Sequence, residues 1–108
     1  MKVIIKEPGE PIGHFAEIDN TLEAMQEIVG GYIETITFPG FVIVCNEEGK
    51  LRGLRENLKL KNDTVVGTVI VCGTDDDEFT DVPFGMFGWW EILKRSGNLW
   101  FGIPNRNL

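Results

Sequence analysis

Residues 32–45 have the sequence YIETITFPGFVIVC, and they predict two strands joined by a short turn. The first half, residues 32–38, is rich in β-branched and aromatic side chains, which favour strands. Pro39 and Gly40 supply the turn. Residues 41–45 are apolar at every position, which is typical of a strand covered on both faces. We therefore expect the second strand to be central in its sheet.

Three further stretches predict strands: residues 2–6, 14–18 and 64–72. Gly67 lies inside the last of them and indicates a bulge or a close backbone approach. Residues 51–60 fit either a strand end or an extended loop. Four leucines are expected to anchor this segment on the core, and they are Leu51, Leu54, Leu58 and Leu60.

The clearest local signal is the start of a helix. Asn20 is the expected N-cap, and Glu23 follows it at the spacing of a capping box. Apolar residues then recur at helical spacing, and these are Leu22, Met25, Ile28 and Val29. Gly30 and Gly31 predict the end of the helix. An amphipathic helix is thus predicted over about residues 20–29, with Glu23 and Glu27 on or near its water-facing side.

The C-terminal part of the chain is rich in aromatic residues. All three tryptophans and four of the seven phenylalanines lie in residues 79–108. One face of a short helix would hold Met86, Trp89, Trp90 and Leu93, and Ser96-Gly97 would close it. Adjacent Trp89 and Trp90 cannot both face inward from one helix. Either these rings complete the core together with Trp100 and Phe101, or one of them faces a partner.

Taken together, these elements predict an α+β fold. We expect a mainly antiparallel sheet with one amphipathic helix (about residues 20–29) packed on it and a short C-terminal helical segment. The chain has 108 residues, which is the size of one domain. Within this single domain, residues 1–73 form the expected core, and residues 74–108 hold an acidic turn and the aromatic segment.

Charge is unevenly distributed along the chain. Nine carboxylates and no lysine or arginine lie between Glu7 and Glu48, and the net charge is −7. Five of the ten basic residues then follow in a basic strip that consists of Lys50, Arg52, Arg55, Lys59 and Lys61. Segregated charge steers partners, so this layout indicates binding. The acidity argues against nucleic acid as a ligand. The strip could bind a small anion such as a nucleotide or phosphate, or it could be a solvated arm that balances the acidic face.

No pattern of residues predicts a catalytic site, a cofactor or a metal. His14 and Ser96 are the only histidine and serine, and they lie at opposite ends of the chain. The acidic turn at residues 75–78 lacks the spacing of a calcium loop. The apolar runs are too short to span a membrane. We expect a cytoplasmic protein, in which Cys45 and Cys72 are buried, reduced thiols.

Several motifs together resemble a known family of small, uncharacterised bacterial proteins. The motifs are Met1-Lys2-Val3-Ile4-Ile5, Ile18-Asp19-Asn20-Thr21-Leu22-Glu23, Gly30-Gly31-Tyr32-Ile33-Glu34, Val44-Cys45-Asn46-Glu47-Glu48-Gly49-Lys50-Leu51, Gly53-Leu54 with Asn57, and Val66-Gly67-Thr68-Val69. The family is known only as a domain of unknown function, and it occurs in Gram-positive genomes, phages and mobile elements. The resemblance covers about residues 1–73. It implies a bacterial or phage setting and a shared scaffold, but no reaction, cofactor or site residue.

We therefore predict a non-enzymatic protein-binding module. Its expected contact surface combines an acidic face with an aromatic patch, drawn from Glu23, Glu27, Trp89, Trp90, Trp100 and Phe101. The partner would be another protein, such as a host or defence protein, or a second copy of the chain. The alternative is a binding protein for a small anionic ligand that uses the basic strip.

Overall fold

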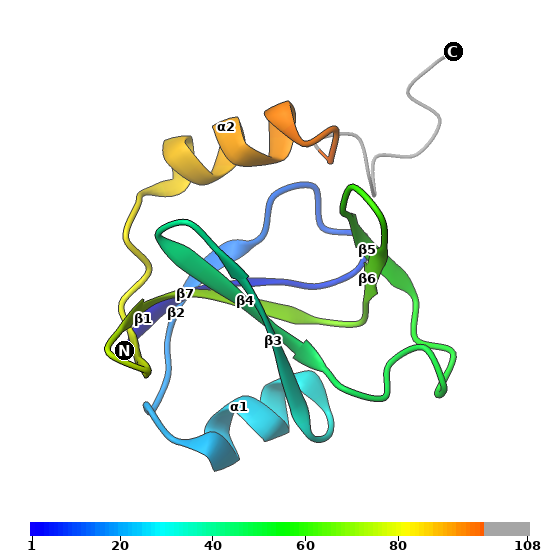
Figure 1. The fold of residues 1–108 in the computed structure, drawn as a ribbon, viewed down its shortest axis with the longest axis horizontal. Coiled ribbons are helices and arrows are strands. Elements are labelled where there is room, and N and C mark those ends of the chain that lie inside the picture. The colour runs from blue at the N-terminus through cyan, green and yellow to red at the C-terminus, as the bar shows by residue number, and fades with distance from the viewer. Residues whose placement is uncertain (99–108) are drawn as a thin grey trace.

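The computed structural model of the protein describes residues 1–98. Its centre is a six-stranded sheet, with helix α1 (Leu22–Val29) against one face and helix α2 (Met86–Arg95) against the other (Figure 1). All strand pairs are antiparallel. This arrangement confirms the predicted α+β class, including the amphipathic helix and the short C-terminal helix.

The main sheet has the strand order β2-β1-β7-β4-β3, and β8 pairs with the end of β7. Its strands are β1 (Lys2–Lys6), β2 (His14–Glu17), β3 (Ile33–Phe38), β4 (Phe41–Asn46), β7 (Val69–Asp75) and β8 (Glu78–Thr80). Strand β4 lies between β7 and β3, as its uninterrupted apolar sequence predicted. Strands β2 and β3 each pair with one neighbour in the described part of the chain, so they form the two edges.

The sheet separates two hydrophobic cores. Along β4, Ile43 and Cys45 face the core that contains α2, whereas Val42 and Val44 face the core that contains α1. Successive residues of a strand point to opposite faces, so a strand covered on both sides must be apolar throughout. Both cysteines are free and buried, as predicted, and Cys72 belongs to the α1 core.

Helix α1 begins one residue later than the predicted cap implies. Thr21 is its N-cap, because the Thr21 hydroxyl accepts a hydrogen bond from the Ala24 amide at 3.1 Å. The expected cap, Asn20, is wrong by one residue: its side-chain amide donates to the carbonyl of Phe79 at 2.9 Å. Asn20 therefore ties the start of α1 to the β7–β8 hairpin. The helix ends at Gly30, as predicted.

Residues 64–72 form two strands instead of the one expected. Strand β6 (Thr64–Val66) pairs with β5 (Glu56–Lys59) in a separate two-stranded sheet, and β7 begins at Val69. Gly67 makes the break, with a φ of +78°. Of the four leucines expected to anchor residues 51–60, Leu58 is buried, but Leu51 is 89 % exposed and anchors nothing. None of the described helices is long and apolar enough to cross a membrane.

Gly67 should be hard to replace for two separate reasons. Its φ of +78° disfavours any side chain, and a Cβ there would stand 2.8 Å from Leu54 Cδ1. We expect Gly67→Ala to lower the free energy of unfolding by roughly 1–3 kcal/mol, measured by urea denaturation. Gly40→Ala is the matched control, since Gly40 has a φ of +89° with no atom near its absent Cβ. Equal losses for the two variants would show that contact with Leu54 contributes nothing.

Candidate functional site

Helix α2 turns one of its two adjacent tryptophans inward. Trp89 is 1 % exposed, and its indole Nε1 donates to the carbonyl of Ile12 at 2.7 Å. Its ring lies parallel to that of Phe84, with 6.2 Å between centroids. A buried indole N–H needs such an acceptor, and the β1–β2 connection supplies it. Trp89 is therefore a core residue and is not available to a partner.

The outer side of α2 carries an aromatic patch, which we call the α2 patch and which consists of Phe87, Trp90 and Lys94. Phe87 is 74 % exposed, and its ring stacks on that of Trp90 with 5.9 Å between centroids. Lys94 Nζ lies 5.0 Å from the centroid of the Trp90 ring, within the range of a cation–π interaction. Spacings of three and four residues place these side chains on one face of the helix.

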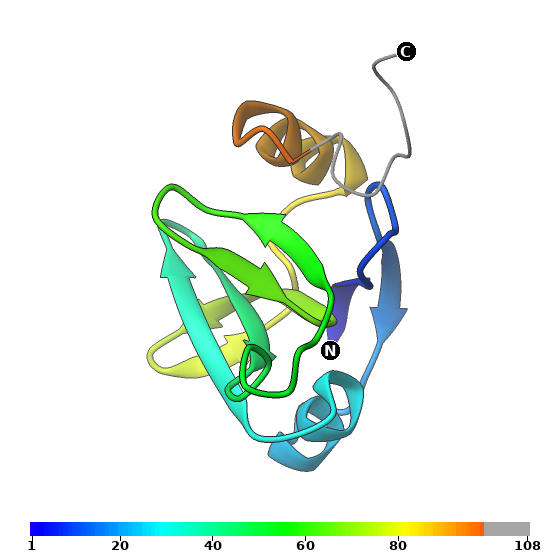
Figure 2. The ribbon, with the colours of Figure 1, turned by 90° about the vertical axis from the view of Figure 1, so that its right-hand side faces the viewer.

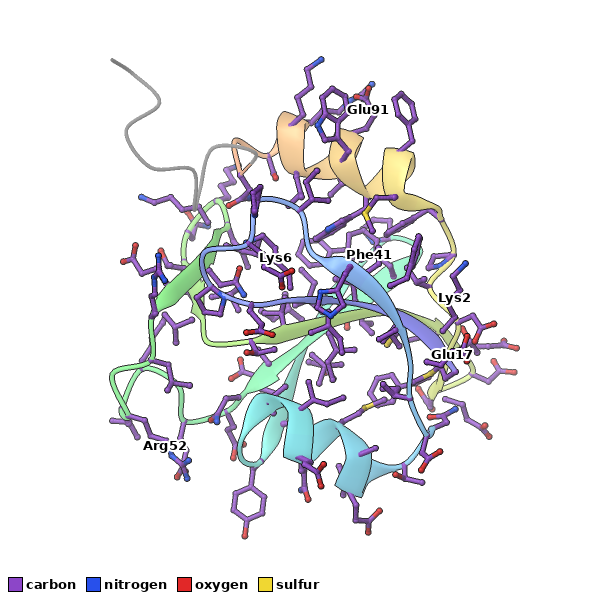
Figure 3. The ribbon with its side chains drawn as sticks, turned by 180° about the vertical axis from the view of Figure 1, so that it is seen from behind. Lys2, Lys6, Glu17, Phe41, Arg52 and Glu91 are labelled. Atoms are coloured by element: carbon purple, nitrogen blue, oxygen red, sulfur yellow. The ribbon has the colours of Figure 1, made fainter. Side chains whose placement is uncertain are left out.

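Beside this patch, Glu91 and Arg95 form an ion pair at 3.8 Å, and Figure 3 shows Glu91 on the side of α2 that points away from the sheet. The structure thus separates the tryptophans as their adjacency required, with Trp90 as the outward one. The other two aromatic residues of the predicted patch, Trp100 and Phe101, lie outside the described residues.

The acidic residues of the predicted contact surface lie elsewhere. Glu23 and Glu27 are exposed on α1, which packs on the opposite face of the sheet from α2 (Figure 1). A partner that covers the α2 patch would therefore not meet these two carboxylates on the same face. The sequence could not show this, because it does not state on which face of the sheet each helix packs.

Two members of the basic strip have structural partners. Arg52 donates from Nη1 to the carbonyl of Gly30 at 3.0 Å, which places a cation at the C-terminal end of α1, where the helix dipole favours it. Arg52 also pairs with Glu48 at 3.4 Å, and Figure 3 shows it at the rim of the molecule. Lys50 forms an ion pair with Asp63 and holds the pKa of that carboxyl below its usual value.

The other three residues of the basic strip do not share a pocket with Lys50 and Arg52. Arg55, Lys59 and Lys61 are exposed on the β5–β6 side. A cavity of about 140 Å³ reaches the strip, but Lys50 is the only one of the five residues that lines it. Three carboxylates line the same cavity, and they belong to Glu34, Glu47 and Asp63. Their negative charge opposes an anionic ligand there.

A buried polar pair lies between β1 and β5. Lys6 is 0 % exposed, and its Nζ donates to Asn57 Oδ1 at 2.6 Å (Figure 3). Asn57 donates in turn to the carbonyls of Lys6 and Gly67, both at 2.8 Å. The pKa of Lys6 is lowered to about 8, mainly by burial; the charge of Glu10 opposes this shift, and nearby Arg55 adds to it. This pair attaches the small β5–β6 sheet to the main sheet.

His14 and Ser96, the only histidine and serine, do not form a nucleophile–base pair. His14 contacts Glu10, and the Ser96 hydroxyl donates to the carbonyl of Leu93 at 3.2 Å, so each has a local partner. Within residues 1–98, no three histidine, cysteine, aspartate or glutamate side chains are grouped as metal ligands would be.

The family model described as "Domain of unknown function (DUF3846)" matches residues 1–89. The chain belongs to this family. The DUF3846 match extends past the resemblance over about residues 1–73 and reaches Trp89, so it includes the first turn of α2. Neither a curated protein nor a solved structure matches the chain.

Three residues of these sites were not identified from the sequence, and they are Lys6, Phe87 and Lys94. Lys6 and Phe87 both lie within the DUF3846 match, whereas Lys94 lies beyond it. The spacing of Phe87, Trp90 and Lys94 could have indicated one exposed helix face, but Gly85 and Gly88 obscured the start of the helix. No local signal could have identified Lys6, because a lysine near the end of a strand is usually exposed.

Proposed function

We propose that the protein is a non-enzymatic, cytoplasmic protein-binding module that contacts its partner through the α2 patch. The observation that carries this proposal is the exposure of Phe87 in a stack with Trp90. Tryptophan is enriched among the few residues that dominate the binding energy of protein interfaces, and phenylalanine is enriched in interface cores. The stack and the Lys94 contact hold the rings in place before binding, so less side-chain entropy is lost when a partner covers them.

The chemistry of the patch favours one kind of partner. Its residues follow the spacing i, i+3 and i+7, which suits a helix that lies in an apolar groove. Lys94 is in the last turn of α2, so a carboxylate at that end of the groove would complement it. We therefore propose a protein partner with an apolar groove and an acidic rim. In a phage or mobile-element setting, the partner would be a host or defence protein.

Anion binding through the basic strip has less support. Lys50 and Arg52 already pair with carboxylates, and three acidic side chains line the neighbouring cavity, where they would repel an anion. The strip is better explained by its local roles, among which the Arg52 contact with the end of α1 is the clearest.

The test places a photo-crosslinking amino acid at position 87 in cells that carry the gene. We expect an adduct with one protein from position 87 and none from position 51, since Leu51 is more exposed than Phe87 but lies outside the patch. The captured protein is then purified, and its affinity for the wild-type chain is measured by calorimetry. Trp90→Ser is expected to weaken that affinity at least tenfold, which corresponds to about 1.4 kcal/mol.

Three outcomes would contradict the proposal. Equal adducts from positions 87 and 51 would indicate random collision. An unchanged affinity for Trp90→Ser would place the contact elsewhere. Sedimentation of the chain with neutral lipid vesicles, lost in Phe87→Ser, would show that the patch binds a membrane surface in place of a protein.

A further inference from the structure

Strand β3 is an edge of the sheet without the usual protection. Within residues 1–98 it pairs with β4 alone, in a regular register over all six residues from Ile33 to Phe38. Figure 2 shows β3 along the margin of the molecule, in cyan. Natural edge strands are usually short, charged, bulged or interrupted by proline, because an open edge pairs with other strands. Strand β3 has no proline, no bulge and one charged residue, Glu34.

The other edge is different. Strand β2 has four residues, and it includes His14 and Glu17 at its two ends. Pro11 and Gly13 precede it. Short length and charge are the features that discourage edge-to-edge pairing. The chain therefore protects β2 and leaves β3 open.

The β3–β4 register shows which backbone groups of β3 are unpaired. The amide of Glu47 donates to the carbonyl of Tyr32 at 2.8 Å, so Tyr32 and Glu47 are a hydrogen-bonded pair. Hydrogen-bonded and non-hydrogen-bonded pairs alternate along an antiparallel ladder. The even-numbered residues of β3 therefore bond to β4. Ile33, Thr35 and Thr37 direct their N–H and C=O groups away from the sheet.

We infer that this edge pairs with β3 of a second copy of the chain and joins the two sheets across a twofold axis. With the axis at Thr35, the outward groups of both strands meet: Thr35 faces Thr35, and Ile33 faces Thr37. Glu34 of one copy then lies opposite Ile36 of the other. Shifting the register by one residue toward the N-terminus would place two Glu34 carboxylates opposite each other, which is destabilising.

A second copy fits this edge better than an unrelated strand does, because the pairing is self-complementary. Tyr32 is 67 % exposed at the start of β3, and in this register it lies opposite Phe38 of the other copy. Aromatic cross-strand pairs and Thr–Thr pairs both stabilise antiparallel strands. The interface uses one strand from each copy, so it is small beside the roughly 1,600 Å² of a standard interface, and the dimer should dissociate on dilution.

The test is disulfide trapping in the full chain. Thr35→Cys should give a covalent dimer on mild oxidation, because directly opposed residues have Cα atoms about 5.5 Å apart, within the range of a disulfide. Thr37→Cys is the matched control: position 37 is on the same edge and is also exposed, but in this register it faces Ile33. We expect at least tenfold more covalent dimer from Thr35→Cys than from Thr37→Cys.

A second measurement does not depend on cysteine. Sedimentation of the wild type should show a concentration-dependent dimer, and Thr35→Pro should be monomeric with an unchanged thermal midpoint, because the Thr35 amide donates no bond to β4. A wild type that stays monomeric at about 100 µM would overturn the inference. Equal trapping at positions 35 and 37, or a dimer that persists in Thr35→Pro, would overturn it as well.

Discussion

Replacing Trp89 with alanine is expected to lower the free energy of unfolding by about 3–5 kcal/mol, the usual cost of removing a buried aromatic side chain. Trp89 is 1 % exposed and packs in one core with Ile43 and Leu93. It also borders an apolar groove of about 240 Å³, which the truncation would enlarge. Small domains have unfolding free energies of about 5–15 kcal/mol, so this single change removes a large share.

The neighbouring tryptophan provides the control. Trp90→Ala removes the same side chain one position later, from the outer face of α2, and should cost about 1 kcal/mol or less. Trp89→Phe removes the donor to the carbonyl of Ile12 but keeps most of the buried ring, and it should cost an intermediate amount. Urea denaturation followed by circular dichroism measures all three variants. Similar losses for Trp89→Ala and Trp90→Ala would show that the inward and outward assignments are wrong.

The second large effect is expected at the buried Lys6–Asn57 pair. Asn57→Ala removes the acceptor of the Lys6 ammonium and the donor to two backbone carbonyls. Leaving a buried donor without its acceptor costs about 1–3 kcal/mol, and more when the donor is charged, as the Lys6 ammonium is. Asn62→Ala, an exposed asparagine in the turn between β5 and β6, should change stability by less than about 0.5 kcal/mol.

The contribution of Lys6 to the free energy of unfolding should depend on pH. The pKa of Lys6 is about 8 in the folded protein, against 10.5 for a lysine in water, so the unfolded chain holds more protons between these two values. Stability rises with pH wherever the unfolded state binds more protons. Below pH 8, Lys6 is charged in both the folded and the unfolded state, so the full free-energy penalty of burying the charge applies. This penalty, on the order of 3 kcal/mol, is relieved as pH rises toward 10.5.

The two buried thiols act in the opposite direction. Burial raises the pKa of Cys45 and Cys72 to about 11 from 9.0, so the unfolded chain loses thiol protons first and stability falls as pH rises through that range. We therefore compare the free energy of unfolding of the wild type with that of Lys6→Met. Both proteins contain Cys45 and Cys72, so the contribution of the thiols cancels in the difference. That difference should shift in favour of the wild type between pH 7 and pH 10. A flat difference would show that the pKa of Lys6 is the same in the folded and the unfolded chain.

The central strands were predictable because their sequences are continuously apolar. Residues 41–45 and 69–72 must be covered on both faces, and nothing else in the chain has that pattern. The helix ends were less certain, because Asn20 and Thr21 are both good N-caps. The choice between them depends on the carbonyl of Phe79, which attracts the Asn20 amide from a distant part of the chain.

The candidate sites depended more strongly on tertiary contacts. Adjacency showed that Trp89 and Trp90 must point in different directions, but the acceptor at Ile12 determines which one is buried. Gly67 was predicted as a bulge or a close backbone approach within one strand, whereas it separates two sheets. The acidic and aromatic residues were expected on a common surface, and the packing of α1 and α2 on opposite faces separates them.

The two buried thiols can be used to follow the opening of the two cores separately. Cys45 belongs to the core on the α2 side of the sheet, where it lines the cavity beside β6, and Cys72 belongs to the core on the α1 side. Both thiols are buried, so the rate at which a thiol reagent modifies each one reports how readily the core on that side opens. Comparing the two modification rates, with each cysteine in turn replaced by alanine, would reveal whether the cores open together or one before the other.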